Sequence, residues 1–132
     1  MTAGAQARSV VGVIISGRCR DLAEHRRAQF PVFSRGHSTL GQSSFTRPSA
    51  VNVPLLISSR DELGTDDGFP SVKIEPGDWV IADEDGVVCV PRELRRKVVE
   101  LATEGKEVDT KCMVDIGDGK GIQASFKKYR GT

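Results

Sequence analysis

The chain has 132 residues, enough for one domain, and its 19 lysines and arginines nearly balance its 18 aspartates and glutamates, which gives a formal net charge of +1. This balance argues against nucleic acid as the main partner, and no apolar run approaches the roughly 20 residues that cross a bilayer. Cys19, Cys89 and Cys112 are too widely spaced for a CxxC metal pair or an obvious disulfide framework, so we expect reduced thiols in a cytoplasmic protein.

Strands and helices alternate in the first part of the predicted structure. The β-branched run that begins at Val10 predicts a buried strand that stops at Gly17. Pro54 indicates an edge, a bulge or a break in a later strand. The predicted elements are, in chain order, a strand at 10–15, a helix at 21–29, a strand at 31–34, a loop at 35–49, a strand at 50–58 and a polar insertion at 60–70.

The second part of the chain predicts a hairpin followed by a helix. The Asp-Gly dipeptide that ends at Gly86 lies between two apolar segments, which is a strong hairpin signal. Pro91 favours the first turn of a helix, and Leu94, Val98 and Leu101 follow helical spacing. The predicted elements are a turn at 75–78, strands at 79–82 and 87–90, and a helix at 92–104. Interleaved strands and helices indicate a layered α/β domain.

Four charged residues follow the first predicted strand, namely Arg18, Arg20, Asp21 and Glu24. The simpler interpretation is a helix start, where an acid offsets the helix dipole and the arginines are solvated. The alternative is a site for an anion and a metal ion. Asp21 and Glu24 would share a helix face, and Mg²⁺ takes one or two carboxylates with several waters. The residues alone leave both interpretations open.

Other polar segments give weaker signals. The loop at 83–86 contains three acidic residues and could bind a cation, but a hairpin turn is the favoured interpretation. His25 and His37 have no neighbouring cysteine or carboxylate pattern, so we expect no zinc site there. Cys19 lies between two arginines but has no paired base, so we interpret it as a non-catalytic side chain.

Four blocks of sequence resemble the RraA-like family, which includes 4-hydroxy-4-methyl-2-oxoglutarate aldolases and bacterial regulators of ribonuclease E. The first block, GVIISGRCRDLAE at 12–24, carries the charged cluster, and the others lie at 30–39, 51–54 and 76–91. They occur in the family's order, and the first two are most similar to fungal members. The resemblance covers residues 1–104, as the C-terminal portion of the family domain, and leaves 105–132 as a charged C-terminal extension.

The resemblance implies a three-layer β/β/α swivelling-domain fold that assembles as homotrimers or hexamers. It implies a divalent-metal-dependent class II pyruvate aldolase that cleaves substrates of the 4-hydroxy-4-methyl-2-oxoglutarate type and also decarboxylates oxaloacetate. By resemblance, Arg20 holds the carboxylate and carbonyl region of a small 2-oxo acid substrate, and Asp21 ligates Mg²⁺ or Mn²⁺. Glu24 supports a water on the metal.

Two departures from the family pattern bear on these expectations. Ser16 stands where many members have an aspartate. The family's Gly-rich loop, whose backbone amides bind the substrate carboxylate, should precede Met1, so we expect an N-terminally truncated chain that lacks the early part of the fold. Such a chain should expose apolar surface and self-associate. The alternatives to the aldolase are a non-catalytic RraA-like regulator that binds a protein partner and an inactive truncated fragment.

Overall fold

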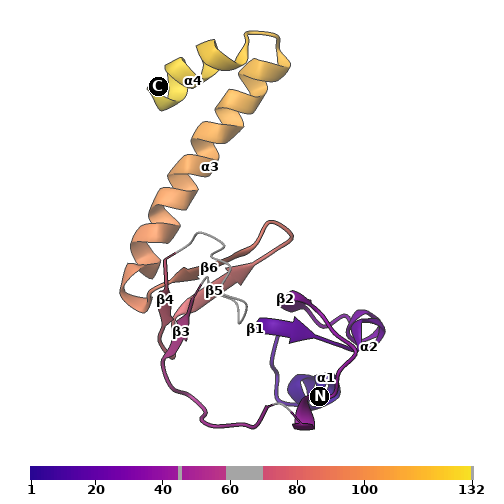
Figure 1. The fold of residues 1–132 in the computed structure, drawn as a ribbon. Helices are drawn as coiled ribbons and strands as arrows, with labels where there is room; N and C mark the ends of the chain where they lie inside the picture. The colour runs from indigo at the N-terminus through magenta and orange to yellow at the C-terminus, as the bar shows by residue number, and fades with distance from the viewer. Residues whose placement is uncertain (45, 59–69, 132) are drawn as a thin grey trace. The chain divides into compact units, whose positions relative to one another are not determined.

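The computed structural model describes residues 1–44, 46–58 and 70–131, and contacts divide the chain into two compact units, Met1–Pro76 and Gly77–Thr132. The first unit contains α1 (Thr2–Gln6), β1 (Val13–Cys19), α2 (Leu22–Arg27), β2 (Val32–His37), the 3₁₀ turn η1 (Gln42–Ser44), β3 (Leu55–Ile57) and β4 (Val72–Ile74) (Figure 1). The second unit contains β5 (Trp79–Ala82), β6 (Val87–Val90), η2 (Arg92–Leu94), α3 (Arg95–Gly117) and α4 (Ile122–Arg130).

The first unit is organised around a parallel strand pair. β1 and β2 pair in register up to Cys19 opposite His37, and α2 lies in the connection between them (Figure 1). Parallel neighbours require such a crossover, because a tight turn cannot return the chain to the same end of the sheet. The carboxyl ends of β1 and β2 therefore lie at one edge of this pair. β3 and β4 form a separate antiparallel pair.

The first strand is shifted toward the C-terminus relative to the prediction at 10–15. The expectation that it stops at Gly17 is wrong, because the register shifts between Ile15 and Arg18 and Gly17 lies in this irregularity. A glycine inside a strand is typical of such a bulge. At the start of β1, the Val13 N–H donates to the Pro31 carbonyl at 3.0 Å, so pairing begins only there.

Two other predicted strands have different bounds. β2 continues three residues beyond the predicted end at Ser34, because it pairs with the extended β1 as far as Cys19. The strand predicted at 50–58 is reduced to β3, since Asn52 has a positive φ of 58° and Pro54 has no backbone N–H to contribute to a ladder. The predicted insertion at 60–70 lies, apart from Pro70, outside the described residues.

The hairpin of the second unit confirms the prediction at both strands. Trp79 lies opposite Val90 and Ala82 opposite Val87. The Asp83 carboxylate accepts hydrogen bonds from the backbone N–H groups of Asp85 at 2.9 Å and Gly86 at 3.3 Å. This carboxylate is therefore occupied in shaping the turn, which favours the hairpin interpretation over a cation site.

The helix predicted at 92–104 continues much further than expected. It begins with η2, passes through Gly105 and ends as α3 at Gly117. Gly105 weakens a helix interior by only about 1 kcal/mol relative to alanine, and the flanking residues favour helix. α4 then packs on the C-terminal end of α3, where Cys112, Asp115 and Ser125 are buried.

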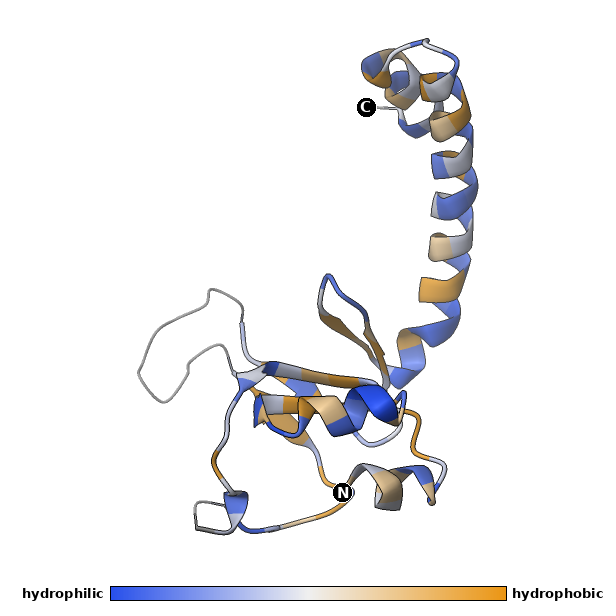
Figure 2. Ribbon diagram, turned by 90° about the vertical axis from the view of Figure 1, so that its right-hand side faces the viewer, coloured by the Kyte–Doolittle hydropathy of each residue, from blue (hydrophilic) through white to orange (hydrophobic). Residues whose placement is uncertain are grey.

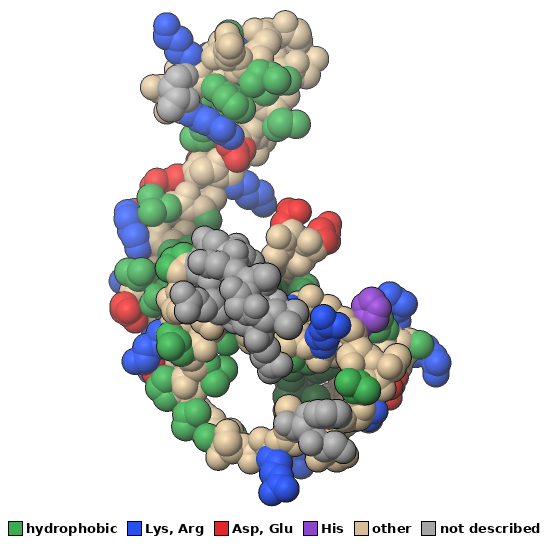
Figure 3. All heavy atoms as spheres, in the orientation of Figure 1, with side chains coloured by type: hydrophobic (Ala, Val, Ile, Leu, Met, Phe, Trp, Pro, Cys, Tyr) green, Lys and Arg blue, Asp and Glu red, His purple; other side chains and the backbone are tan. Residues whose placement is uncertain are grey.

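Few apolar side chains are buried within the described residues. The buried ones are Cys19, Phe30, Val90 and Cys112. By contrast, Ile14 in β1 is 44% exposed and Leu56 in β3 is 71% exposed, so the first strand is not the buried strand that its β-branched run predicts, and apolar surface is exposed as expected for this chain. Segments of high and low hydropathy alternate along the ribbon of α3 (Figure 2), and hydrophobic and charged side chains are visible on the surface of the chain (Figure 3). No described helix combines the length and the apolar character that a membrane span needs.

Candidate functional site

The charged cluster lies at the carboxyl edge of the parallel strand pair. Cys19 ends β1, and its carbonyl accepts a hydrogen bond at 2.8 Å from the N–H of Ser38, which directly follows β2. Arg20 and Asp21 come immediately after this last paired residue. In α/β sheets, ligands bind outside the carboxyl ends of the strands. The topology therefore places two of the three predicted site residues where such sheets present their chemistry.

Asp21 has an unusual backbone conformation. Its φ of 62° and ψ of 36° lie in the left-handed region, which aspartate enters more readily than most residues. Asp21 is the N-cap of α2, yet its side chain makes no capping hydrogen bond. The Asp21 side chain therefore does not cap the helix through a hydrogen bond, although its charge still lies at the N-terminus of α2.

The Asp21 carboxylate pairs instead with its neighbour. Arg20 Nε lies 3.3 Å from Asp21 Oδ2, and the two side chains are 49% and 54% exposed. An exposed pair of this kind stabilises a fold by about 0–1 kcal/mol. The Arg20 guanidinium also lies close to Gly41. A Cβ atom added to this glycine would be 3.6 Å from Arg20 Nη1. Both groups are consequently accessible to a ligand at the strand edge.

Glu24 lies in the first turn of α2 and is exposed. Its backbone N–H donates to the Asp21 carbonyl at 2.9 Å, so the two residues belong to the same turn. The helix predicted at 21–29 is observed as Leu22–Arg27, and Asp21 precedes it in a left-handed conformation, so helical spacing does not put the Asp21 and Glu24 side chains on one face. The three residues share one short segment, and their common site and their roles stay predictions.

The donor set suits one kind of metal site. Among the described residues, no group of three or more His, Cys, Asp or Glu side chains could hold a metal ion. Mg²⁺ and similar hard cations, however, use one or two carboxylates and keep several waters. Two exposed carboxylates, Asp21 and Glu24, fit a water-rich site of this type and not the closed cage of a structural zinc.

Sequence reasoning missed the part that His25 plays at this site. Its Nε2 lies 2.8 Å from the Arg20 carbonyl oxygen, and its Nδ1 lies 2.8 Å from Thr2 Oγ1. Helical spacing places His25 one turn after Asp21, which was a usable signal. The contact with Thr2 joins residues 23 positions apart, so no local sequence pattern predicts it.

The cysteines lie outside the candidate site. Cys19 is buried and accepts a hydrogen bond from Ser34 Oγ at 3.2 Å, in keeping with a non-catalytic side chain. Burial, together with the negative charge of Asp78, raises the pKa of the Cys89 thiol, so this group stays protonated at neutral pH. All three cysteines are free thiols, and two of them are buried.

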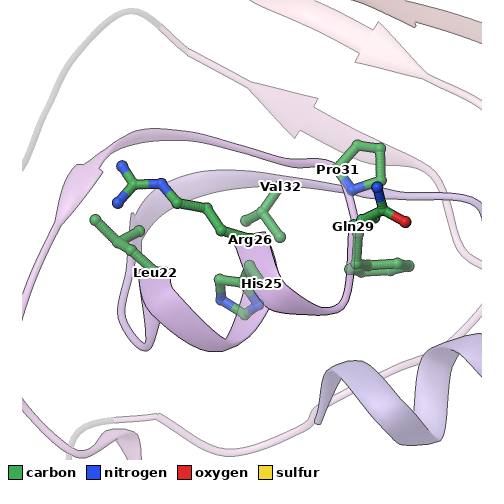
Figure 4. A pocket seen from close by; sticks show the side chains of 7 residues that line it. Leu22, His25, Arg26, Gln29, Pro31 and Val32 are labelled. Atoms are coloured by element: carbon green, nitrogen blue, oxygen red, sulfur yellow. The ribbon is translucent and has the colours of Figure 1, made fainter.

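A shallow groove of about 370 Å³ flanks α2 on the side of the buried Phe30. Leu22, His25 and Arg26 project into it from α2, and residues 29–32 complete its lining (Figure 4). Arg20, Asp21 and Glu24 do not line it. His25 is the residue that the groove and the candidate site share.

Comparisons with known proteins agree with the fold. The RraA-like family model, described as Aldolase/RraA, matches residues 1–89. A protein of Halalkalibacterium halodurans named "Putative 4-hydroxy-4-methyl-2-oxoglutarate aldolase" is 29% identical over 125 residues, which cover 94% of this chain and 53% of that protein. A protein of the same name from Halorhodospira halophila is 38% identical over 86 residues, covering 63% of this chain and 43% of that protein.

A solved structure shows the same fold. The crystal structure of an uncharacterized protein from Pseudomonas syringae has a TM-score of 0.84 and 30% sequence identity, and the match covers 98% of this chain and 55% of that one. The predicted α/β fold is thereby confirmed. The chain spans about half the length of the curated relatives named above.

Proposed function

The chain belongs to the RraA-like family, and we propose that it carries the metal and substrate residues of a class II pyruvate aldolase. In this proposal Asp21 ligates Mg²⁺ or Mn²⁺, Glu24 supports a water on the metal, and Arg20 binds a small 2-oxo acid. The substrate is of the 4-hydroxy-4-methyl-2-oxoglutarate type, and oxaloacetate is decarboxylated at the same site. The aldolase names of two relatives support this reading.

One observation carries the proposal. Arg20 and Asp21 project from the carboxyl end of β1 as an exposed pair, with Asp21 in a left-handed conformation and without a capping role. Left-handed non-glycine residues recur at functional sites, and Ser9, Gln29 and Asn52 also have positive φ in this chain, so the conformation supports the proposal through its position beside the exposed Arg20. The pair contributes little to stability, so its accessibility to a ligand is the more informative property.

The reaction requires charge stabilisation at the 2-oxo group of the substrate. A base removes the proton of the C4 hydroxyl, the C4–O bond becomes a carbonyl of the departing product, and the C3–C4 bond breaks. Its electron pair forms the C2–C3 double bond while the carbonyl pair moves to the C2 oxygen, which gives the enolate of pyruvate. Protonation at C3 then yields pyruvate. When oxaloacetate is the substrate, carbon dioxide leaves from C3 and the same enolate forms. One site that stabilises this enolate therefore serves both reactions.

Arg20 supplies that stabilisation from the protein side. Its guanidinium donates charge-assisted hydrogen bonds to the carboxylate and to the oxygen where negative charge develops. A divalent cation held by Asp21 would supply Lewis-acid stabilisation of the same oxygen. Asp21 and Glu24 provide the hard carboxylate oxygens that such a cation requires. Arg20 and the acids thus act on one end of the substrate.

The test measures metal binding and pyruvate release by residues 1–132. We expect Mn²⁺ to bind and to support decarboxylation of oxaloacetate, and both to be lost in Asp21→Asn and on addition of EDTA. Glu84→Gln is the matched control, because Glu84 is an exposed acid in the loop between β5 and β6. Equal Mn²⁺ affinity in the two variants would contradict the metal site. A folded chain that binds no Mn²⁺ and releases no pyruvate would favour the protein-binding regulator.

Assembly is part of the same proposal. We expect this chain to self-associate, because β1 and β3 expose apolar side chains such as Ile14 and Leu56. Members of the family are expected to form trimers or hexamers. Light scattering on purified residues 1–132 measures the size, and a hydrophobic dye reports bare apolar surface. A monomer that binds no dye would contradict this expectation.

A further inference from the structure

His25 connects the candidate site to the first helix of its unit. Its Nε2 lies 2.8 Å from the Arg20 carbonyl oxygen, and its Nδ1 lies 2.8 Å from Thr2 Oγ1. A carbonyl oxygen can only accept, so Nε2 carries the proton. In the neutral ring Nδ1 then accepts, and the Thr2 hydroxyl donates to it. Both ring nitrogens are therefore engaged, and the imidazole is fixed between α1 and Arg20.

The hydrogen bonds of His25 hold the chain on both sides of Asp21. The imidazole binds the carbonyl of the preceding residue, Arg20. The His25 backbone N–H donates to the Asp21 carbonyl at 3.2 Å, alongside the Glu24 N–H at 2.9 Å. The left-handed Asp21 thus lies between two peptides that are each held by His25. A non-glycine residue keeps this conformation only where its surroundings impose it.

Thr2 gives this arrangement a rigid anchor. The residue is 3% exposed, so its hydroxyl needs an internal partner, and His25 Nδ1 is one. The hydrogen bond sets the plane of the imidazole, and the hydroxyl can donate to Nδ1 in the tautomer that the Arg20 carbonyl requires. The neighbouring groove receives His25 beside Leu22 and Arg26 (Figure 4), so packing also limits the ring.

We propose that His25 is a positioning residue. It fixes the Arg20–Asp21 peptide so that the guanidinium and the carboxylate leave the end of β1 in one arrangement, and Thr2 fixes His25 in turn. The consequence for metal binding rests on the proposed function of Arg20 and Asp21. Partners that orient a ligand from outside the metal's contacts typically change affinity or activity by about 10–100-fold.

The first experiment reads the arrangement without any metal. Long-range ¹H–¹⁵N spectra of the imidazole should show the Nε2–H tautomer of His25. The Asp21 amide belongs to the peptide whose carbonyl His25 binds, so its ¹⁵N shift should change in His25→Leu and Thr2→Val. It should stay unchanged in Thr2→Ser, which keeps the hydroxyl, and in Arg27→Ala, an exposed position on the same helix. An Nδ1–H tautomer of His25, or an Asp21 amide ¹⁵N shift that does not change in His25→Leu, would overturn the proposal.

The second experiment measures Mn²⁺ affinity by electron paramagnetic resonance. We expect a loss of about 10-fold in His25→Leu and about threefold in Thr2→Val. His25→Gln should recover part of the loss, because its side-chain amide can donate to the Arg20 carbonyl. Thr2→Ser and Arg27→Ala should match the unaltered chain. Urea unfolding of each variant checks that it is folded, and Thr2→Val remains decisive if His25→Leu fails to fold.

The outcomes separate this proposal from the proposed function. An unaltered chain that binds no Mn²⁺ overturns the metal site and with it the effect of His25 on metal binding, while the spectra still decide whether His25 holds the Arg20–Asp21 peptide. An unaltered chain that binds Mn²⁺, with His25→Leu as tight as Arg27→Ala, overturns the positioning role alone.

Discussion

Two paired aspartates, one in each unit, differ in ways that indicate different roles. The Asp115 side chain is 7% exposed and accepts hydrogen bonds from Lys120 at 2.6 Å and Lys128 at 3.0 Å. The Asp21 side chain is 54% exposed, and Arg20 Nε lies 3.3 Å from its carboxylate. Asp115 lies in regular helix within α3, whereas Asp21 has a left-handed backbone at a strand edge.

The difference lies in what each carboxylate does for the fold. The hydrogen bonds from Lys120 and then Lys128 lower the pKa of Asp115 to about 2, so the ionised form is favoured in the folded hairpin of α3 and α4. Removing it leaves two lysines without their shared acceptor. Removing Asp21 takes away one exposed pair of little energetic consequence. Loss of Asp115 should therefore affect stability, and loss of the Asp21 pair should affect activity.

The largest expected effect is on activity at Arg20. We expect Arg20→Ala to lower the rate constant for oxaloacetate decarboxylation by about 10²–10³-fold, as loss of an oxyanion-type donor does. The free energy of unfolding should change by less than about 1 kcal/mol, because the pair is exposed. Steady-state kinetics and urea unfolding measure the two quantities. Arg27→Ala is the control. An equal loss of activity in both variants would contradict the role of Arg20 as the donor to the substrate.

The reverse pattern is expected at Asp115. Asp115→Ala should lower the free energy of unfolding of the α3–α4 hairpin while leaving Mn²⁺ affinity unchanged. Asp118→Ala is the matched control, since Asp118 is exposed and its contact with Lys120 is longer, at 3.4 Å. Urea unfolding followed by circular dichroism compares the two variants. If Asp115→Ala lowers the free energy of unfolding no more than Asp118→Ala does, then burial of the carboxylate does not determine its contribution to stability.

The pH dependence of stability gives a sharper form of the same test. Asp115 has a lower pKa in the folded hairpin than its ordinary value of 3.8, so it binds protons more readily when unfolded. Its contribution is therefore fully present above about pH 4 and is lost as the pH falls through about 2. Unfolding midpoints measured between pH 6 and pH 2 should fall less in Asp115→Asn than in the unaltered chain. Parallel pH profiles would contradict the assignment.

Local patterns predicted the elements that depend on neighbouring residues. The Asp-Gly signal before Val87 predicted both strands of the hairpin. The charged run suggested Arg18, Arg20, Asp21 and Glu24, of which the family resemblance selected the last three, and Arg18 lies within β1. The same reasoning failed at Gly105. One glycine is a weak helix breaker when its neighbours favour helix and α4 packs on the end of α3. The predicted division of the chain at residue 104 stays a prediction.

Long-range contacts account for the features that the sequence did not predict. The end of β1 depends on its pairing with β2, which carries the strand past Gly17. The contact of His25 with Thr2 depends on the placement of α1 against α2 and on no local spacing. Likewise, the left-handed conformation of Asp21 comes from the hydrogen bonds around it. Residue types could therefore suggest the candidate site, whereas its supporting contacts required the structure.

The smallest expected effect tests whether exposure or location determines the contrast between the aspartates. In the second unit, Arg95 Cζ lies 5.1 Å from the centroid of the Trp79 ring, and Trp79 is 44% exposed. An exposed cation–π contact contributes about 0.5–1 kcal/mol, so Arg95→Ala should destabilise the unit by no more than this. Trp79 is the sole tryptophan, so its fluorescence reports the contact directly. Arg96→Ala, at a neighbouring exposed position, should leave both the emission and the unfolding midpoint unchanged.

If Arg95→Ala destabilises the second unit as strongly as Asp115→Ala does, then that unit is sensitive at exposed and buried positions alike. Exposure would then be the wrong basis for separating Asp21 from Asp115. A small loss instead means that the buried, doubly paired Asp115 carboxylate stabilises the second unit more than an exposed contact does, which supports exposure as the basis for the contrast with Asp21.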